Sequence, residues 1–570
     1  MDPARTGQDT RFKLPPGLWF LSEVLGGRSP DMPVFPEEVP TGGIHRGAAP
    51  TLGPVTFTAR TAGAMAVSVL GVVPDGEGPL FLETLKDLQL DAIIGAVTSG
   101  RAGYDLVPFF HSPCRDAETV AFRHEVFRDL EIPSCLDAVE RFSSGMQSVR
   151  EQLAQAGKLH YRLQQQALVL AAARTYCSAV TGLRGELSAL GLQSPGFRAL
   201  TAFLDAYTSS GFFTRIRTEA DRIRADLDAV SYKIHIDGGH VSVSPYRDEV
   251  DYTAEVEATF ARFRQGAVKD YRSKLPTPVE LDHVEAQVLD RVAILFADTF
   301  DRLNDFCTRY TSFQNPTITR FDREIQFYIS YLCHIRPLKD AGLSFCYPEV
   351  SVTSKQTSAA DAFDLALAVN LVREKAPVVT NDVELHGAER ILIVSGPNQG
   401  GKTTFARTVG QLHYLAALGV PVPGTRARVF LPDGIYTHFE REENRMDLRG
   451  KLEDDLIRVQ RVLSQATPRS VIILNEIFTS TTLNDAIYLG REVLGRIVVL
   501  DLICVCVTFV EELASVSATT VSMVSTVLPE DPSVRTFKVV RRRADGRAYA
   551  KVLARKYGLN YESLKERIRS

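Results

Sequence analysis

The feature that most constrains this chain is a glycine-rich loop between an apolar segment and a helical segment. Residues 396–403 match the pattern G-x-x-x-x-G-K-[ST]. The apolar residues 391–394 before the loop predict a buried strand, and the residues from Thr404 onward predict a helix. Glycines let backbone N–H groups turn toward phosphate oxygens, and the helix N-terminus adds positive potential. The sequence therefore predicts a site for a nucleoside triphosphate, and ATP is the preferred candidate. A glycine-rich turn that binds nothing is the alternative, which the flanking strand and helix disfavour.

The roles of the loop residues follow from this chemistry. Lys402 is expected to reach the β- and γ-phosphates, and the Thr403 hydroxyl is expected to coordinate Mg²⁺. ATP and Mg²⁺ are therefore the predicted cofactors. The residues of the loop predicted to bind the nucleotide are Gly396, Pro397, Asn398, Gln399, Gly400, Gly401, Lys402, Thr403 and Thr404.

A P-loop ATPase also needs a carboxylate at the end of a neighbouring strand. Residues 471–474 form an apolar run, and Asn475 and Glu476 follow it. Glu476 is predicted to orient or deprotonate the attacking water, and it forms the predicted catalytic pair with Lys402. Asn475 stands where Asp is usual, and it keeps an oxygen acceptor without the charge that Mg²⁺ prefers. Thr403, Asn475 and Glu476 are thus the predicted metal site, with slow hydrolysis as its consequence. A structural hydrogen bond is the alternative role for Glu476.

The pattern of the chain predicts several domains of different kinds. With 570 residues, the chain is expected to form about two to four domains. Residues 1–80 are rich in Pro and Gly, and residues 81–344 have a helical pattern interrupted by a β-hairpin at 232–243. From 345 to 570, apolar runs of strand length alternate with helical segments, which is typical of a parallel sheet. The predicted fold class is a multidomain α plus α/β protein, with a helical body followed by a P-loop α/β domain.

Composition limits the cellular setting more than the function. The net charge is −4, which does not exclude nucleic-acid binding, since basic residues cluster at 262–274. A solvated helix face is the alternative role for that cluster. The eight cysteines include no CxxC pair, and reduced thiols favour a cytoplasmic location. No signal peptide and no bilayer-spanning segment is recognised, so no membrane association is expected.

Several segments together resemble the MutS family of DNA mismatch repair ATPases. Residues 396–404 are similar to the family's GPNMGGKST loop, and residues 475–482 are similar to its DEIGRGTS segment. Residues 378–382 resemble the family's FVPND segment, which adds Asn381 to the predicted nucleotide-binding residues. The resemblance extends over about residues 81–570.

The resemblance implies a helical core and lever, followed in the chain by an ATPase domain of the MutS/ABC type. It also places a DNA clamp at about residues 230–275. It also implies a homodimer with composite ATPase sites, in which the nucleotide state controls DNA binding. Phe509 replaces the family's His, and Val378 replaces an aromatic residue that stacks on adenine. With no counterpart of the mismatch-reading domain expected in residues 1–80, the chain resembles a divergent branch. Two alternatives to a DNA-binding ATPase are a nucleotide-gated scaffold with little hydrolysis and a protein that clamps RNA.

Overall fold

The structure, a computed structural model, groups the chain into two compact units. It describes residues 10–13, 67–71, 81–237, 240–247, 281, 283–440, 450–528, 530–531 and 534–543, together with 559, 561 and 565. Unit 1 comprises Met1–Ala66, Asp137–Leu190 and Thr201–Pro316, and unit 2 comprises Val67–Leu136, Gly191–Leu200 and Thr317–Ser570. The domain boundaries expected near 80 and 344 do not coincide with the divisions between these units, and they stay predictions.

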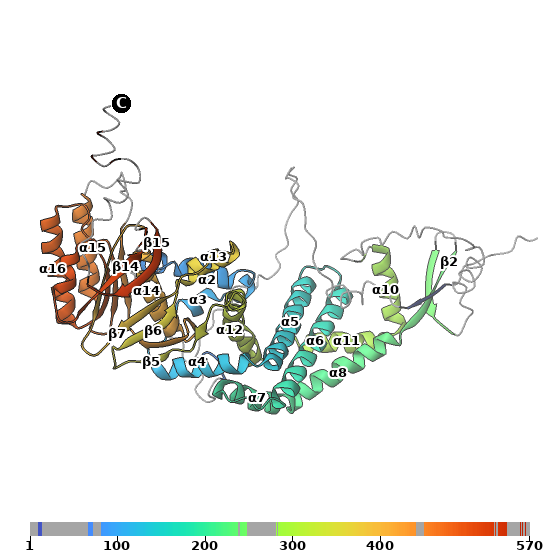
Figure 1. Ribbon diagram of the computed structural model, residues 1–570. Coiled ribbons are helices and arrows are strands. Elements are labelled where there is room, and N and C mark those ends of the chain that lie inside the picture. The colour runs from blue at the N-terminus through green and yellow to red at the C-terminus, as the bar shows by residue number, and fades with distance from the viewer. Residues whose placement is uncertain are drawn as a thin grey trace, which may run out of the picture. The chain divides into compact units, whose positions relative to one another are not determined.

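Unit 1 is built mainly from amphipathic helices. Leu163, Leu168 and Leu170, whose spacing predicts a helix, are all buried along α6. α6 packs against α8 and α11, so that their apolar stripes are covered without a sheet. Figure 1 shows these helices, whose bounds are α5 Pro133–Ala156, α6 Arg162–Ser188, α7 Pro195–Thr208, α8 Gly211–Asp228, α10 His283–Leu295 and α11 Ala297–Arg309.

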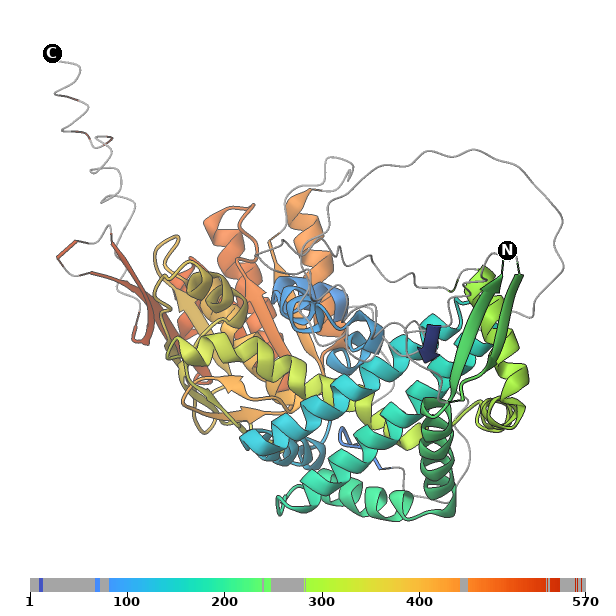
Figure 2. The same ribbon diagram turned by 90° about the vertical axis from the view of Figure 1, so that its right-hand side faces the viewer.

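The predicted β-hairpin is present and has a third strand. β2 (Ser231–Asp237) and β3 (His240–Pro245) pair antiparallel, with Asp237 opposite His240. β1 (Thr10–Lys13) pairs antiparallel with the other edge of β2, which the sequence does not predict. Figure 2 shows this short dark-blue strand beside the green hairpin. The basic segment 262–274 lies outside the described residues.

Unit 2 contains a six-stranded sheet that holds the predicted glycine loop. The strand order is β11-β12-β13-β8-β14-β15, and all neighbours pair parallel except the antiparallel pair β14–β15. This confirms the parallel sheet predicted from the apolar runs at 391–394, 471–474 and 503–507. The bounds are β8 Ile391–Ser395, β11 Ile435–Phe439, β12 Val471–Asn475, β13 Ile503–Val507, β14 Thr520–Val527 and β15 Arg535–Arg541.

The central strands are buried on both faces, which explains why they are apolar without alternation. Ile393, Leu474 and Cys504 face one core cluster together with residues of α15 (Lys451–Gln465) and α16 (Leu483–Leu500). Figure 1 shows these two helices side by side. α14 (Lys402–Leu418) also contacts β8, β12 and β13, and its residues are buried along most of its length. The sheet therefore has a layered α/β arrangement.

A smaller mixed sheet and further helices complete unit 2. The order of the smaller sheet is β5-β10-β6-β7, and β7 lies next to β15 of the larger sheet. A two-stranded sheet pairs β4 with β9. The remaining bounds are α1 Phe81–Asp87, α2 Leu90–Thr98, α3 Val107–Phe110, α4 Ala117–Leu130, α12 Pro316–Asp340, β4 Phe345–Cys346, β5 Glu349–Ser351, β6 Thr357–Ala362, α13 Leu365–Arg373, β7 Asn381–Leu385, β9 Val422–Pro423 and β10 Arg426–Phe430.

Two further observations bear on the setting of the chain. All eight cysteines lie within the described ranges and are free thiols, five of them buried. Among the helices that the structure describes, none combines the length and the apolar character needed to cross a membrane.

A buried histidine on α14 makes the stability of unit 2 depend on pH. His413 is 0% exposed, and its Nδ1 lies 2.8 Å from the Val409 carbonyl oxygen. Burial lowers the pKa of His413 from 6.5 to about 4. Since the unfolded chain takes up this proton first, the stabilisation is complete above pH ~6.5 and is lost as pH falls toward 4.

We therefore expect the free energy of unfolding to fall by about 1.4 kcal/mol per pH unit for this histidine, between about pH 6.5 and 4. Urea unfolding at a series of pH values measures this slope. A His413→Gln variant should show a shallower slope, and an unchanged slope would contradict the assignment.

Candidate functional site

The glycine loop lies between β8 and α14, at the carboxyl end of the parallel strands. Three residues turn the chain there with positive φ: 122° at Gly396, 58° at Gln399 and 89° at Gly401. Gly401 is the N-cap of α14 and has no side chain that could accept from the first N–H groups of the helix. A helix end of this kind is suited to binding an anion.

Strand β14 packs directly against the loop and excludes side chains at two glycines. A Cβ at Gly400 would lie 2.3 Å from the Ser525 hydroxyl oxygen, and one at Gly396 would lie 2.9 Å from the Ser525 carbonyl oxygen. The Ser525 hydroxyl also donates a hydrogen bond of 2.5 Å to the Gly400 carbonyl oxygen. Glycine is thus required at both positions because of a strand that follows much later in the chain.

Lys402 directs its ammonium group into the loop. The side chain is only 3% exposed, and Nζ donates to the carbonyl oxygens of Gly396 at 3.2 Å and of Pro397 at 3.1 Å. Nζ also lies 4.3 Å from the centre of the Phe509 ring, a cation–π contact. Burial lowers the pKa of Lys402, and the Glu476 carboxylate opposes this shift. The lysine is therefore a buried cation in the position predicted for a phosphate ligand.

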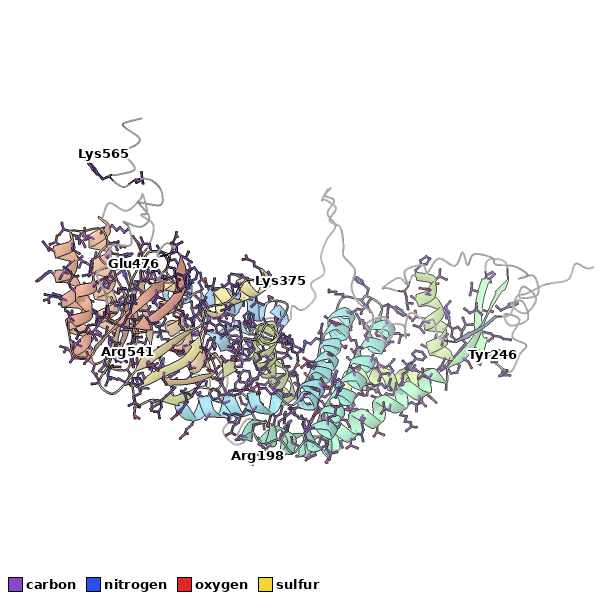
Figure 3. All side chains as sticks on the ribbon, viewed as in Figure 1. Arg198, Tyr246, Lys375, Glu476, Arg541 and Lys565 are labelled. Atoms are coloured by element: carbon purple, nitrogen blue, oxygen red, sulfur yellow. The ribbon has the colours of Figure 1, made fainter. Side chains whose placement is uncertain are left out.

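The predicted acidic residue lies at the end of β12, and this strand is not a neighbour of β8. β13 lies between them, and the Glu476 N–H donates to the Val507 carbonyl oxygen at 2.9 Å. The expectation of a neighbouring strand was wrong because the spatial order of the strands does not follow their order in the chain. Glu476 and Lys402 nevertheless border the same cavity, since parallel strands end at one edge of the sheet. Figure 3 labels Glu476 in this part of unit 2.

Glu476 combines an unusual backbone conformation with a shifted pKa. Its φ is 56°, a left-handed value that is strained for a residue with a side chain and is often found at functional sites. Burial raises the pKa of Glu476, the Lys402 ammonium lowers it, and the charge of Glu440 raises it further. A carboxylate with a raised pKa is better suited to accept a proton near neutral pH.

Asn475 places an oxygen acceptor in the interior without a donor. The residue is 7% exposed, and its Oδ1 accepts no hydrogen bond from the residues that the structure describes. A buried acceptor without a donor is costly unless a water molecule or ion satisfies it. Thr403 borders the cavity from the first turn of α14. These oxygens have the chemistry that a hydrated Mg²⁺ ion prefers, so that Thr403 would be its ligand and Asn475 would contact its water if such an ion were bound.

A cavity of about 440 Å³ joins most of the predicted residues. This is within the range of about 300–1,000 Å³ that small-molecule sites occupy. Four predicted residues do not line it: Gly396 and Pro397 supply carbonyl oxygens to Lys402, the Asn398 carbonyl oxygen accepts a hydrogen bond from Arg535, and Asn475 is the last residue of β12. The predicted residues that do line it are Asn381, Gln399, Gly400, Gly401, Lys402, Thr403, Thr404 and Glu476.

The cavity also has an apolar wall that the sequence does not predict. Leu367 and Leu371 of α13 lie there, with residues 377–379 and the Phe537 side chain. Phe537 is 48% exposed, and its backbone has a φ of 58°. Phe537 therefore adds an aromatic residue to the apolar lining of the cavity.

Asn381 fixes the position of Phe537. Its Nδ2 donates to the Phe537 carbonyl oxygen at 3.2 Å, and its Oδ1 accepts from the Val539 N–H at 2.7 Å. Asn381 thus borders the cavity as predicted and also joins β7 to β15. No local signal in the sequence singles out Phe537, because Asn381 lies 156 residues before it and the two meet only in the folded unit.

The parallel sheet, the glycine loop and the cavity at the strand ends define an α/β domain of the P-loop type. Residues 392–562 match the family model described as MutS domain V. This part of the chain is therefore similar to domain V of the MutS family, the family that the sequence motifs predict.

Three curated proteins show the extent of the similarity. DNA mismatch repair protein MutS of Chloroflexus aurantiacus is 34% identical over 122 residues, or 21% of this chain and 13% of that protein. DNA mismatch repair protein msh3 of Botryotinia fuckeliana is 32% identical over 143 residues, 24% of this chain and 13% of that protein. DNA mismatch repair protein Msh3 of Mus musculus is 30% identical over 124 residues, 22% of this chain and 11% of that protein. The matched part thus spans only about an eighth of these relatives.

The contact of the loop with β14 predicts a specific loss of stability. Gly400→Ala should lower the free energy of unfolding by about 1–3 kcal/mol, because the added methyl group meets the Ser525 hydroxyl in a packed interior. Gly495→Ala on α16 is a matched control, since its Cβ would meet no atom of the described residues within 4 Å. Urea unfolding compares the two variants. Equal effects would show that β14 does not restrict the loop.

Proposed function

We propose that unit 2 binds ATP with Mg²⁺ in the cavity between the glycine loop and Glu476. The observation that carries this proposal is the buried ammonium of Lys402, which lies inside a loop of positive-φ residues. Burying a cation costs free energy unless an opposite charge compensates it. The phosphates of a nucleotide supply that charge at the N-terminus of α14.

The polar end of the cavity provides the groups that phosphate transfer to water requires. Lys402 binds the β- and γ-phosphates, and backbone N–H groups of the loop donate to their oxygens. Thr403 and Asn475 would hold Mg²⁺, and the ion would supply positive charge beside the phosphate oxygens. Glu476 orients the attacking water and accepts its proton, for which its raised pKa is suited.

The apolar end of the cavity is suited to the nucleobase. Phe537 supplies an aromatic face, and Leu367 and Leu371 supply aliphatic contacts. This supports a base-stacking role for Phe537, at a site where Val378 replaces the family's aromatic residue. Selectivity for adenine depends on this wall, because the phosphate loop itself does not distinguish bases.

We further propose that this ATPase domain controls DNA binding by a homodimer. The support is the match of residues 392–562 to MutS domain V, the names of the relatives as DNA mismatch repair proteins, and a helical unit that carries an antiparallel hairpin. The two ATPase sites would be composite, each completed by the partner copy, and the nucleotide state would change the hold of the hairpin region on DNA. We also infer a cytoplasmic location, which the eight free thiols support.

A nucleotide-gated scaffold with little hydrolysis is the second candidate function. Two observations favour it: Asn475 lacks the charge of Asp, and the Phe509 ring contacts Lys402 where the family has a histidine. Both changes weaken groups that act in the transition state, and neither removes the phosphate-binding loop. Both substitutions therefore lead to the same expectation, which is tight nucleotide binding with slow hydrolysis.

Phe537→Ala should separate base contacts from phosphate contacts. Loss of stacking worth about 1–3 kcal/mol predicts an affinity for ATP that is about 5- to 150-fold weaker. The affinity for inorganic triphosphate, measured by calorimetry, should stay unchanged, and Phe537→Tyr should keep the affinity for ATP. A parallel loss for both ligands would contradict a base-stacking role.

The function itself is tested by turnover and by DNA binding. We expect slow ATP hydrolysis that Glu476→Ala abolishes, and no nucleotide binding by Lys402→Ala. Binding to duplex, branched and mismatched DNA, and to structured RNA, is measured with and without ATP at several salt concentrations. Salt-dependent DNA binding that responds to ATP supports the proposal. Absence of turnover with intact nucleotide binding would favour the scaffold, and preference for RNA would overturn the DNA assignment.

A further inference from the structure

Glu440 lies one strand beyond the predicted metal site and is not part of the predicted set. It directly follows β11, whose last residue Phe439 is paired with Asn475 of β12. Because β11 and β12 are parallel, Glu440 and Glu476 leave the sheet at the same edge. The Glu440 carboxylate therefore belongs by topology to the edge that carries the cavity.

Two side chains hold the Glu440 carboxylate. Thr479 Oγ1 donates to its Oε1 at 3.3 Å, and Lys451, the first residue of α15, forms an ion pair with the same oxygen. The side chain of Glu440 is 38% exposed, so that water reaches it. A carboxylate held in this way has a second oxygen for further contacts.

The same edge lacks a charge at Asn475. Asn475 is only 7% exposed, and its Oδ1 accepts no hydrogen bond from the described residues. A divalent ion near a neutral amide and a single carboxylate is less well balanced than one between two carboxylates. The pairing of Phe439 with Asn475 brings Glu440, the next residue, to this part of the sheet edge.

We propose that Glu440 supplies the second carboxylate of the Mg²⁺–nucleotide site, in place of the charge that is absent at position 475. It acts as a positioning residue through coordinated water, and Asn475 accepts from the same hydration shell. Lys451 is its counter-ion. This inference rests on the proposed binding of ATP with Mg²⁺, and it adds a residue that the sequence motifs do not contain.

A purely structural role for Glu440 makes a different prediction. If the carboxylate only anchors α15 through Lys451, then Lys451→Ala and Glu440→Gln have the same effect. If it supplies charge to the metal site, Lys451→Ala leaves that charge in place, and Asn475→Asp makes Glu440 dispensable. These variants therefore distinguish the two roles.

The experiment measures binding of a fluorescent ATP analogue to the full chain as Mg²⁺ is raised from zero in the presence of a chelator. Glu440→Gln should need about 10- to 100-fold more Mg²⁺ for half-maximal binding, as for other residues that support a metal site from outside its ligand shell. Binding at zero Mg²⁺ should be unchanged. Asn475→Asp/Glu440→Gln should return to the Mg²⁺ requirement of the parent chain, and Lys451→Ala should not raise it.

Mn²⁺ provides a second readout that needs no turnover. Electron paramagnetic resonance of free Mn²⁺ with nucleotide and protein should show weaker retention for Glu440→Gln, and recovery in the double variant. Equal losses in Glu440→Gln and Lys451→Ala, or no recovery with Asn475→Asp, would overturn the inference. If the parent chain binds no nucleotide at all, the proposed function fails. If it binds with a Mg²⁺ requirement that Glu440→Gln leaves unchanged, only the role of Glu440 fails.

Discussion

The candidate site depends on one buried cation. Lys402 is almost completely removed from solvent, and the carbonyl oxygens of its own loop, the ring of Phe509 and the charge of Glu476 compensate only part of the cost. The loop needs positive φ angles to place those carbonyls, and β14 keeps it in that shape through Ser525. A phosphate group that approaches the N-terminus of α14 relieves the remaining imbalance, so the energetics of the loop favour an anion.

Sequence reasoning predicts best what is local in the chain. The glycine loop, its strand and helix, and the hairpin are each specified by fewer than about 20 consecutive residues, where periodicity and turn chemistry act directly. The parallel sheet is also predicted, because strands buried on both faces have a distinct apolar composition. The order of the strands in the sheet is not predicted, because no local signal shows that β13 lies between β8 and β12.

The residues that sequence reasoning misses are those that come together across long stretches of chain. Phe537 lines the cavity beside Asn381, which binds its backbone, and Glu440 is placed by the pairing of β11 with β12 and by its contacts with Thr479 and Lys451. Neither residue belongs to a recognisable spacing pattern, and each adds a group to those of the motifs: an aromatic side chain and a second carboxylate. To judge the chemistry of a site whose motifs have diverged, the substitutions within the motifs and those in the residues around them need to be considered together.

The strand between β8 and β12 has a consequence for the dimensions of the site. Neighbouring strands are separated by about 4.8 Å, so two steps place the ends of β8 and β12 roughly 10 Å apart. β13 contributes no member of the predicted catalytic set. The Glu476 N–H nevertheless donates to Val507, its last residue, and the N–H of Thr508, the residue after it, donates to Val394. That width separates the strand that leads into the glycine loop from the strand that leads into Glu476. β13 thus acts as a fixed spacer, which makes the reach between the two functional groups a property of the sheet.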